Sequence, residues 1–266
     1  MTSRTEWHEL PRPVRAAVEE RTGPVTTARA LTGGLNCAVA AALTAADGTV
    51  TFVKGTPVTN STARTGQRWE VVVNPYTLAV GPRLLWRVTV GGWEVLGFEY
   101  VEGARHADLS VGAGDLRLVA EALGDAHGLR PPPPHLGVPS FAGRWAAFLE
   151  TGELPLLHGR TLLHTDTHPH NLLVTADRAH LVDWAMPALG PAWVDVANTA
   201  VRLMEADCPP HDALAWAAGF TACWRTASPA ALRAFVAANC RAWTSRVGAI
   251  DARPSNDRFA ALLGLL

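Results

Sequence analysis

Polar side chains that can do acid–base and metal chemistry gather between residues 161 and 195. Asp166 and Asn171 lie in one short polar loop, and Asp183 follows the next pair of apolar runs. Phosphoryl transfer uses these residue types: a carboxylate that orients and deprotonates the attacking hydroxyl, and oxygen ligands for the magnesium ions on the phosphates. The residue types and their spacing therefore indicate phosphoryl transfer.

Protein kinases place the catalytic Asp and a metal-binding Asn in one loop, H-R-D-x-x-x-x-N, and a later D-F-G Asp also takes the metal. Here His164-Thr165-Asp166 is followed by Asn171 at the same interval, and Asp183 ends the next hairpin. The pattern predicts Asp166 as the catalytic base and Asn171 and Asp183 as magnesium ligands.

On these residues the chain resembles the aminoglycoside phosphotransferase and choline kinase-like family, small-molecule relatives of the protein kinases. Thr165 in place of arginine, and Trp184-Ala185 in place of Phe-Gly, are what that family tends to show. The resemblance implies that Asp195 braces the catalytic loop from the next helix. It is most specific over residues 161–198 and extends more weakly over most of the rest.

The histidines around the predicted base leave a second chemistry open. His164, His168 and His170 together with Asp166 could form the zinc site of a hydrolase, because histidine and carboxylate are zinc ligands. Against this, Pro169 bends the loop, and no helix carries two histidines at H-x-x-x-H spacing. We interpret His164 as a packed residue that supports the loop, and His168 and His170 as loop-surface or substrate-side residues.

Short strands should position this loop. Apolar runs at residues 161–163, 172–175 and 180–182 are bounded by polar turns, a pattern typical of buried strands. The polar residues then lie at strand ends and in a loop, where a rigid scaffold can aim them at a ligand.

The N-terminal part should form a sheet. The sequence predicts strands at residues 25–31, 37–43 and 49–54, with Gly33-Gly34 in the first turn. In a kinase-like lobe this turn covers the nucleotide phosphates, since glycine lets backbone N–H groups approach closely. A plain hairpin turn would have the same sequence.

Lys54 is the only lysine among 23 basic residues. Lysine is a compact point charge and arginine a planar fork, so a lysine in this arginine-rich chain indicates a role that arginine cannot fill. The segment TFVK matches the V-A-I-K position, whose lysine binds the α- and β-phosphates and a helix glutamate. Glu70 is the only acid between Lys54 and Glu94, so we predict it as that partner, with a surface glutamate as the alternative. It lies in a helix expected over residues 62–73 and ended by Pro75.

A further hairpin, residues 83–90 and 93–99, leads to the segment FEYVEG, which resembles a kinase hinge. The resemblance implies that Glu99 offers its carbonyl and Val101 its N–H to adenine. Helical patterns follow at residues 115–127, 141–151, 192–206, 210–226, 229–248 and 256–264.

These elements predict an α+β, two-lobed, protein-kinase-like fold. Residues 1–103 would form a small antiparallel-sheet lobe that binds the nucleotide and ends in the hinge. Residues 104–266 would form a mainly helical lobe that carries catalysis and acceptor binding.

Composition excludes several other classes. Apolar residues make up 48% and charged residues 18% of the chain, and the net charge is −1, which is typical of soluble globular proteins without a drive toward nucleic acid or membrane. No apolar run reaches the length of a membrane span, and the polar N-terminus does not match a signal peptide. The four cysteines are scattered, as expected of reduced thiols, so the sequence predicts a cytoplasmic protein.

The predicted function is the transfer of the ATP γ-phosphate to a hydroxyl of a small molecule, with ATP and Mg2+ as cofactors. The loop between Asp183 and Asp195 is too short for an activation segment that docks an extended peptide. An aminoglycoside-like antibiotic is the acceptor that the family suggests. Because residues 104–266 hold 13 Arg against 15 Asp plus Glu, a less charged antibiotic, a nucleoside, a sugar or an amino alcohol fits equally well.

Two alternatives remain at this stage: a kinase acting on Ser or Thr of a peptide precursor, and a catalytically inactive, pseudokinase-like nucleotide-binding protein. The complete set of Lys54, Asp166, Asn171 and Asp183 favours an active enzyme, since a decayed site usually lacks one of these residues. The sequence gives no prediction of the oligomeric state.

Overall fold

The computed structural model describes residues 4–31 and 37–265. The chain forms two compact units: Met1–Ala104 with Val182–Ala185, and Arg105–Leu181 with Met186–Leu266. Gly33 and Gly34, predicted to cover the phosphates, lie outside the described residues.

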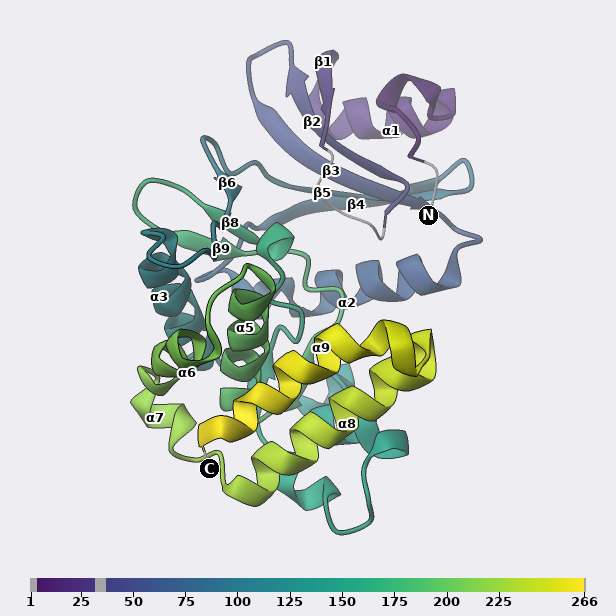
Figure 1. The fold of residues 1–266 in the computed structure, drawn as a ribbon. Coiled ribbons are helices and arrows are strands. Elements are labelled where there is room, and N and C mark those ends of the chain that lie inside the picture. Colours follow the sequence, from purple (N-terminus) through teal and green to yellow (C-terminus); the bar gives the residue numbers. More distant parts are fainter. Residues whose placement is uncertain (1–3, 32–36, 266) are drawn as a thin grey trace. The chain divides into compact units, whose positions relative to one another are not determined.

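The first unit contains a five-stranded antiparallel sheet (Figure 1). Its order is β1-β2-β3-β5-β4, from β1 (Val25–Ala30), β2 (Val39–Ala45), β3 (Val50–Pro57), β4 (Leu84–Val90) and β5 (Trp93–Glu99). A two-residue turn joins β4 to β5, and its residues Gly91 and Gly92 have φ angles of 57° and 77°. Positive φ at both positions is the geometry of a tight hairpin turn, for which glycine has no steric penalty.

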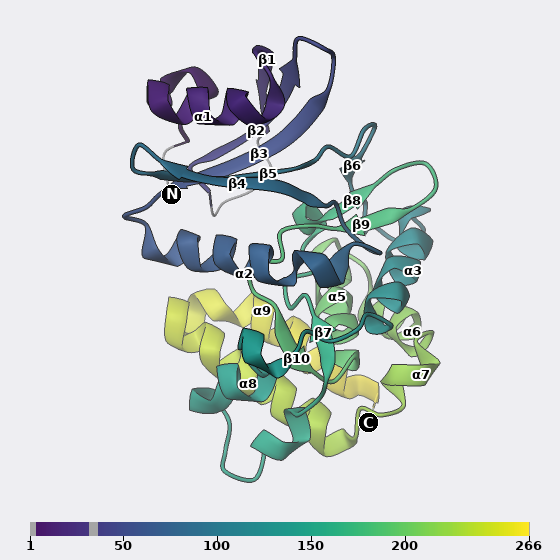
Figure 2. The same cartoon turned by 180° about the vertical axis from the view of Figure 1, so that it is seen from behind.

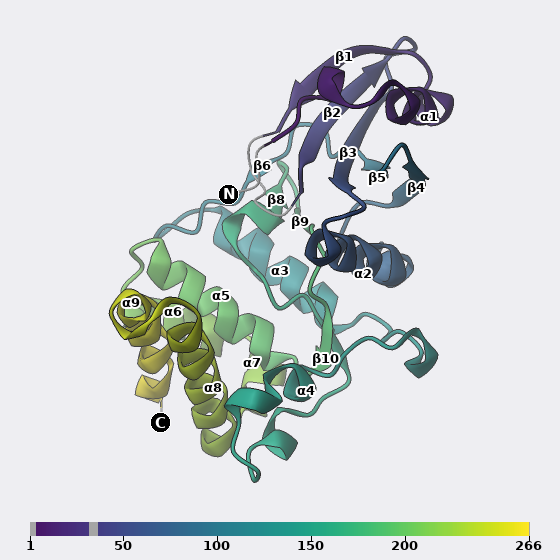
Figure 3. The same ribbon diagram turned by 90° about the vertical axis from the view of Figure 1, so that its right-hand side faces the viewer.

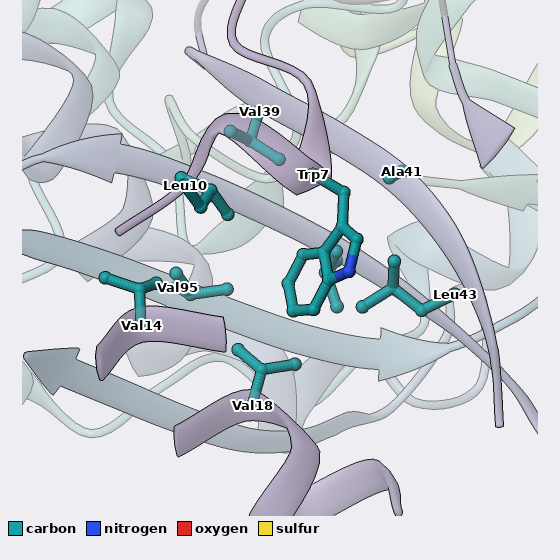
Figure 4. Close-up of a cluster of buried hydrophobic side chains, with 9 residues drawn as sticks. Trp7, Leu10, Val14, Val18, Val39, Ala41, Leu43 and Val95 are labelled. Atoms are coloured by element: carbon teal, nitrogen blue, oxygen red, sulfur yellow. The ribbon is translucent and has the colours of Figure 1, made fainter. Parts of the chain in front are cut away.

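Helices cover both faces of this sheet, with α1 (Arg12–Thr22) on one face and α2 (Ser61–Thr77) on the other (Figure 2). A buried cluster joins α1 and the preceding turn to the strands: Trp7, Leu10, Val14, Val18, Val39, Ala41, Leu43, Val53 and Val95 (Figure 4). Successive strand residues point to opposite faces, so Val53 enters this cluster and Lys54 faces α2.

The prediction that Pro75 ends the second helix was wrong, because α2 runs from Ser61 to Thr77 with Pro75 inside it. Pro75 lies in the last turn, where its missing N–H forfeits a single helical bond. The side chain of Asn74 anchors that turn: its amide donates to Pro82 O (2.9 Å) and its carbonyl oxygen accepts from Leu84 N (2.8 Å). Contacts outside the helix thus extend it past the proline.

The second unit has short strands and many helices. β7 (Thr161–Leu163) pairs with β10 (Ala188–Gly190), and β6 (Arg105–His106), β8 (Leu172–Val174) and β9 (Ala179–Leu181) form a second small sheet. The principal helices are α3 (Asp115–His127), α4 (Phe141–Trp145), α5 (Trp193–Glu205), α6 (Pro210–Ala218), α7 (Thr221–Trp224), α8 (Pro229–Val247) and α9 (Ala249–Ala261). Helices α8 and α9 pack side by side, as Figures 1 and 3 show. Among the described residues, none of the helices is both long and apolar enough to cross a bilayer.

Three predicted helices differ from the structure. The helix expected over residues 141–151 stops as α4 at Trp145, and the one over 210–226 divides into α6 and α7 around Gly219. The last helix begins at Ala249, earlier than expected, and includes Pro254. The carbonyl that Pro254 leaves without a helical donor belongs to Ile250, an exposed residue where water can replace the bond.

Candidate active site

In the first unit, three residues singled out from the sequence meet. Lys54 Nζ lies 2.6 Å from Glu70 Oε1 and 2.8 Å from Asp183 Oδ1. Lys54 ends up there because it faces α2 from β3, and Glu70 is on the buried side of α2. The Lys54 and Glu70 side chains are only 9% and 5% exposed, whereas Asp183 is 24% exposed. The lysine is therefore buried between two carboxylates, one of them open to solvent.

The charges of this ion triad do not balance. Burial by itself lowers the pKa of Lys54, but the carboxylates of Asp183 and Glu70 outweigh that effect and raise its pKa above the usual value. Burial, with the nearby charge of Asp183, raises the pKa of Glu70 against the lowering effect of Lys54. One ammonium thus lies between two carboxyl groups, and burial disfavours the charge on Glu70, the more buried of the two.

The segment that carries Asp183 has a constrained backbone. Asp183 has a φ of 62°, and Ala185 N donates to its carbonyl at 2.7 Å. A Cβ added to Gly66 of α2 would lie 3.1 Å from Ala185 Cβ, tighter than an ordinary contact. A non-glycine residue held at positive φ costs about 1–3 kcal/mol, and such residues cluster at functional sites. Gly66, whose lack of a side chain lets this segment pack closely against α2, was not recognised from the sequence.

In the second unit, the loop after β7 brings Asp166 and Asn171 together. Asn171 Nδ2 donates to the carbonyl of Asp166 at 3.0 Å and to its Oδ2 at 3.1 Å. Asn171 is buried, while the Asp166 side chain is 37% exposed. Two hydrogen bonds thus join Asp166 to Asn171, five residues later in the sequence, and the Asp166 carboxylate stays accessible to solvent.

Asp195 holds the same loop from α5. Its Oδ2 accepts from His164 N at 2.7 Å and its Oδ1 from Thr165 N at 2.9 Å. Burial raises the pKa of Asp195, although these bonds to the carboxylate and the neighbouring His164 act in the opposite direction. Thr165 has a φ of 67°, so the carboxylate stabilises a turn that a β-branched residue rarely adopts. The buried His164 accepts from Asp166 N through its Nδ1 at 3.3 Å.

Further residues of α5 contact the loop and were missed by sequence reasoning. Asn198 Nδ2 donates to Thr165 O at 3.5 Å, and Thr199 Oγ1 lies 2.8 Å from Thr167 Oγ1. Arg202, one turn further along, lies 3.7 Å from Asp166 Oδ1. Together with Asp195 these residues follow the helical intervals of three and four, so a polar stripe on one face of α5 was the available signal.

Arg144 of α4 was also missed, and no sequence signal marks it. Its guanidinium donates to Thr165 Oγ1 (3.1 Å) and to the carbonyls of Met186 (2.7 Å) and Pro187 (2.6 Å). Burial lowers the pKa of Arg144. This side chain therefore ties the loop after β7 to the segment that enters β10.

The other histidines stack on one another. His168 Nδ1 accepts from His170 N at 3.2 Å, and the two rings lie 4.8 Å apart. The His170 ring meets that of His106 edge to face at 4.9 Å. Within the described part of the chain, no group of three or more His, Cys, Asp or Glu side chains is arranged to hold a metal ion.

The predicted hinge residues follow β5. Glu99 is its last residue; its backbone N donates to Arg83 O at 2.9 Å and its carboxylate accepts from Arg83 N at 3.0 Å. The carbonyl of Val101 accepts from Ala104 N at 3.4 Å. The adenine contacts of Glu99 and Val101 stay a prediction.

Removing the charge of Asp195 should destabilise the protein. In Asp195→Asn, an amide N–H₂ group faces the N–H of His164 or Thr165, and one buried donor loses its acceptor. We expect urea unfolding to show a free energy of unfolding lowered by about 1–3 kcal/mol. Asp257→Asn, on the exposed surface of α9, is the control. An unchanged midpoint in Asp195→Asn would contradict the bracing role.

Residues 139–243 match the model of the phosphotransferase enzyme family. The matched stretch includes Asp166, Asn171, Asp183 and Asp195. The match confirms the resemblance noted in the sequence and the prediction of an enzyme of the phosphotransferase class. A search of curated proteins found no significant match.

Solved phosphotransferase structures have the same fold at low sequence identity. An aminoglycoside phosphotransferase from Alicyclobacillus acidocaldarius is 15% identical over 97% of both chains, with a TM-score of 0.56. A mutant aminoglycoside 2′-phosphotransferase-IIIa, solved with GDP, is 14% identical over 95% of this chain and 96% of that chain (TM-score 0.58). The amicoumacin kinase hAmiN, solved with AMP-PNP and Ca2+, is 11% identical over 94% of this chain and 92% of that chain (TM-score 0.56). The predicted α+β, kinase-like fold class is confirmed.

Proposed function

Because residues 139–243 match the phosphotransferase enzyme family, we propose that this protein transfers the γ-phosphate of ATP to a hydroxyl of a small molecule. The observation that carries the proposal is the position of the chain's single lysine, Lys54, buried between Glu70 and Asp183. A buried lysine whose ammonium is fixed by two carboxylates is suited to orient phosphate oxygens as a point charge.

The reaction has one proton to move. In the proposed transfer, the acceptor oxygen forms a bond to the γ-phosphorus while the bond from that phosphorus to the β–γ bridging oxygen breaks. Asp166, whose carboxylate is accessible, takes the proton of the acceptor hydroxyl, and ADP leaves. The loop that carries Asp166 is held in position by hydrogen bonds with Asp195, His164 and Arg144.

We assign Asn171 and Asp183 as the residues that would hold Mg2+. Along the chain, Asn171 directly precedes β8 and Asp183 follows β9 by two residues. Amide and carboxylate oxygens suit this hard cation. When bound, Mg2+ would neutralise charge on the phosphates.

Nucleotides in the similar structures guide the choice of donor. The amicoumacin kinase contains AMP-PNP, and the aminoglycoside 2′-phosphotransferase contains GDP. For this chain we propose ATP, bound by backbone groups of Glu99 and Val101 at the base and of Gly33 and Gly34 at the phosphates. Because ATP is abundant inside cells, we place the reaction in the cytoplasm.

The proposed acceptor is an aminoglycoside-like antibiotic or a related hydroxylated metabolite. Phosphorylation of an antibiotic would make the protein a resistance enzyme. The near balance of 13 Arg with 15 Asp plus Glu over residues 104–266 also suits acceptors with few charges. The panel of acceptors should therefore include aminoglycosides, macrolides, nucleosides, sugars and amino alcohols.

Mass spectrometry tests the proposed function directly. The purified protein is incubated with Mg2+ and ATP, or with GTP in parallel, and each acceptor is examined for the mass gain of one phosphoryl group. Transfer to a small molecule supports the proposal. Transfer only to a peptide would replace it by a peptide kinase, and nucleotide binding without any transfer would indicate an inactive nucleotide-binding protein.

Chelation of divalent ions should abolish transfer. Excess EDTA is expected to stop phosphorylation of the acceptor, because the phosphate charge is then uncompensated, and added Mg2+ should restore it. Zn2+ added instead of Mg2+ is the comparison, because zinc prefers nitrogen and sulfur ligands over this oxygen-only set. Full activity in EDTA, or rescue by Zn2+ alone, would contradict the assignment of Asn171 and Asp183.

A further inference from the structure

We propose that Arg202 of α5 is a positioning residue that fixes the carboxylate of Asp166 for the transfer, and that Glu205 fixes Arg202 in turn. The inference rests on the proposed function and assigns a role to two residues outside the kinase-like sequence pattern. It is carried by contacts within the second unit alone.

The two oxygens of the Asp166 carboxylate have different partners. Oδ2 accepts a hydrogen bond from Asn171 Nδ2 at 3.1 Å. Oδ1 faces Arg202 Nη2 at 3.7 Å. One edge of the carboxylate is therefore bonded and the other is oriented by a cation, which together restrict rotation of the side chain about its last torsion.

The distance of 3.7 Å is informative because it exceeds hydrogen-bond length. A direct hydrogen bond from Arg202 would take one of the two lone pairs of Oδ1 and lower the basicity of the oxygen that has to accept the proton of the acceptor hydroxyl. At this separation Arg202 attracts Asp166 Oδ1 electrostatically and leaves the oxygen available as a base. The geometry suits a positioning role better than a closed ion pair would.

Arg202 is itself held in place. Its Nη1 donates to Glu205 Oε2 at 2.7 Å, so one arm of the guanidinium is anchored while the other points at Asp166. Arg202 and Glu205 are 31% and 29% exposed and lie in the last turn of α5. A cation is favourable at a helix C-terminus, and a planar fork can engage two carboxylates at once.

An ordinary surface ion pair on another helix gives a matched comparison. Arg117 and Glu121 of α3 lie 2.5 Å apart one turn from each other, but their side chains are 69% and 54% exposed. Among the described residues, the side chain of Arg117 pairs with Glu121 and with no residue of the Asp166 loop, so its loss removes only a helix-surface pair of the same kind. Arg117→Gln is therefore the control for general effects of removing an arginine.

Steady-state kinetics of Arg202→Gln tests the inference, with the acceptor that gains phosphate in the panel as the probe. We expect kcat to fall by about 10–100-fold, with KM for ATP and for the acceptor changed less than about threefold, since misplacement of a catalytic group mainly affects the transition state. Arg202→Lys should lose less than Arg202→Gln because the charge remains. Guanidinium ion should restore part of the activity of Arg202→Ala. Arg117→Gln should match the wild type.

A double-variant cycle separates positioning from folding. If Arg202 acts through Asp166, Arg202→Gln should cause no further loss in an Asp166→Asn background. Glu205→Gln should lower kcat less than Arg202→Gln does, because Glu205 acts one step further away. Thermal unfolding and ATP binding are measured for every variant. If Arg202→Gln does not fold, Arg202→Lys replaces it in the kinetics and in the double-variant cycle.

The outcomes distinguish this inference from the proposed function. An active wild type with an unchanged kcat in Arg202→Gln overturns the inference alone. The same holds for an equal loss in the Asp166→Asn background. A wild type that transfers phosphate to no acceptor overturns the proposed function, and the inference with it.

Discussion

Asp166→Asn should lower the rate of phosphate transfer by about 10²–10⁴-fold, the usual contribution of a positioned acid–base group. Asparagine has the same shape as aspartate and can still accept a hydrogen bond from Asn171, whose amide lies 3.1 Å from Asp166 Oδ2. It cannot accept the proton of the acceptor hydroxyl. The protein should therefore fold and bind ATP normally while turnover is lost.

Rates from coupled ADP detection and ATP affinities from calorimetry would check this expectation. Asp177→Asn is the matched control, because Asp177 lies in the exposed turn between β8 and β9, away from the loop. A full rate in Asp166→Asn would show that another group removes the proton. A variant that no longer binds ATP would place Asp166 in nucleotide binding.

Lys54→Met should abolish transfer and destabilise the protein at the same time. Without the ammonium, Glu70 loses its ion-pair partner Lys54 while its side chain stays almost fully buried. Breaking a buried ion pair by removing one partner typically costs about 3–5 kcal/mol. Urea unfolding should show this loss, and calorimetry should show weaker ATP binding. Lys54→Arg should also be poorly active, since a planar fork does not replace a compact charge.

A second substitution separates the two effects of Lys54→Met. Lys54→Met combined with Glu70→Leu removes the buried carboxylate as well and should recover much of the stability, because apolar replacement of a buried pair is often neutral. It should not recover transfer, because the charge that orients the phosphates is still missing. Restored transfer in the double variant, or full activity in Lys54→Met, would remove Lys54 from the mechanism.

Sequence spacing predicted the positions of side chains correctly where regular secondary structure fixes their direction. The alternation of strand side chains is enough to turn Lys54 away from the cluster that contains Val53. Glu70 was chosen because the chain offers no other acid in the helix that follows, and the ion pair with Lys54 forms at 2.6 Å. In these cases chemistry and local periodicity leave few choices.

Helix ends were predicted less well, for a physical reason that α2 makes plain. A proline costs a helix a bond, but Pro75 lies where Asn74 ties the last turn to Pro82 and Leu84. That compensation depends on residues brought together by folding. A rule that considers only neighbouring residues ends the helix too early.

The sequence by itself determined the family resemblance, the fold class and the residue types able to carry out the chemistry, since these depend on composition, spacing and local periodicity. The tertiary structure alone decided which side chains support them. Arg144 is separated from Thr165 by 21 positions and Arg202 from Asp166 by 36. No local pattern marks Arg144, and the polar stripe on α5 that includes Arg202 does not say which loop residue that arginine contacts. Contacts of this kind arise because helices α4 and α5 pack against the loop, and packing depends on the whole core rather than on any one stretch of chain.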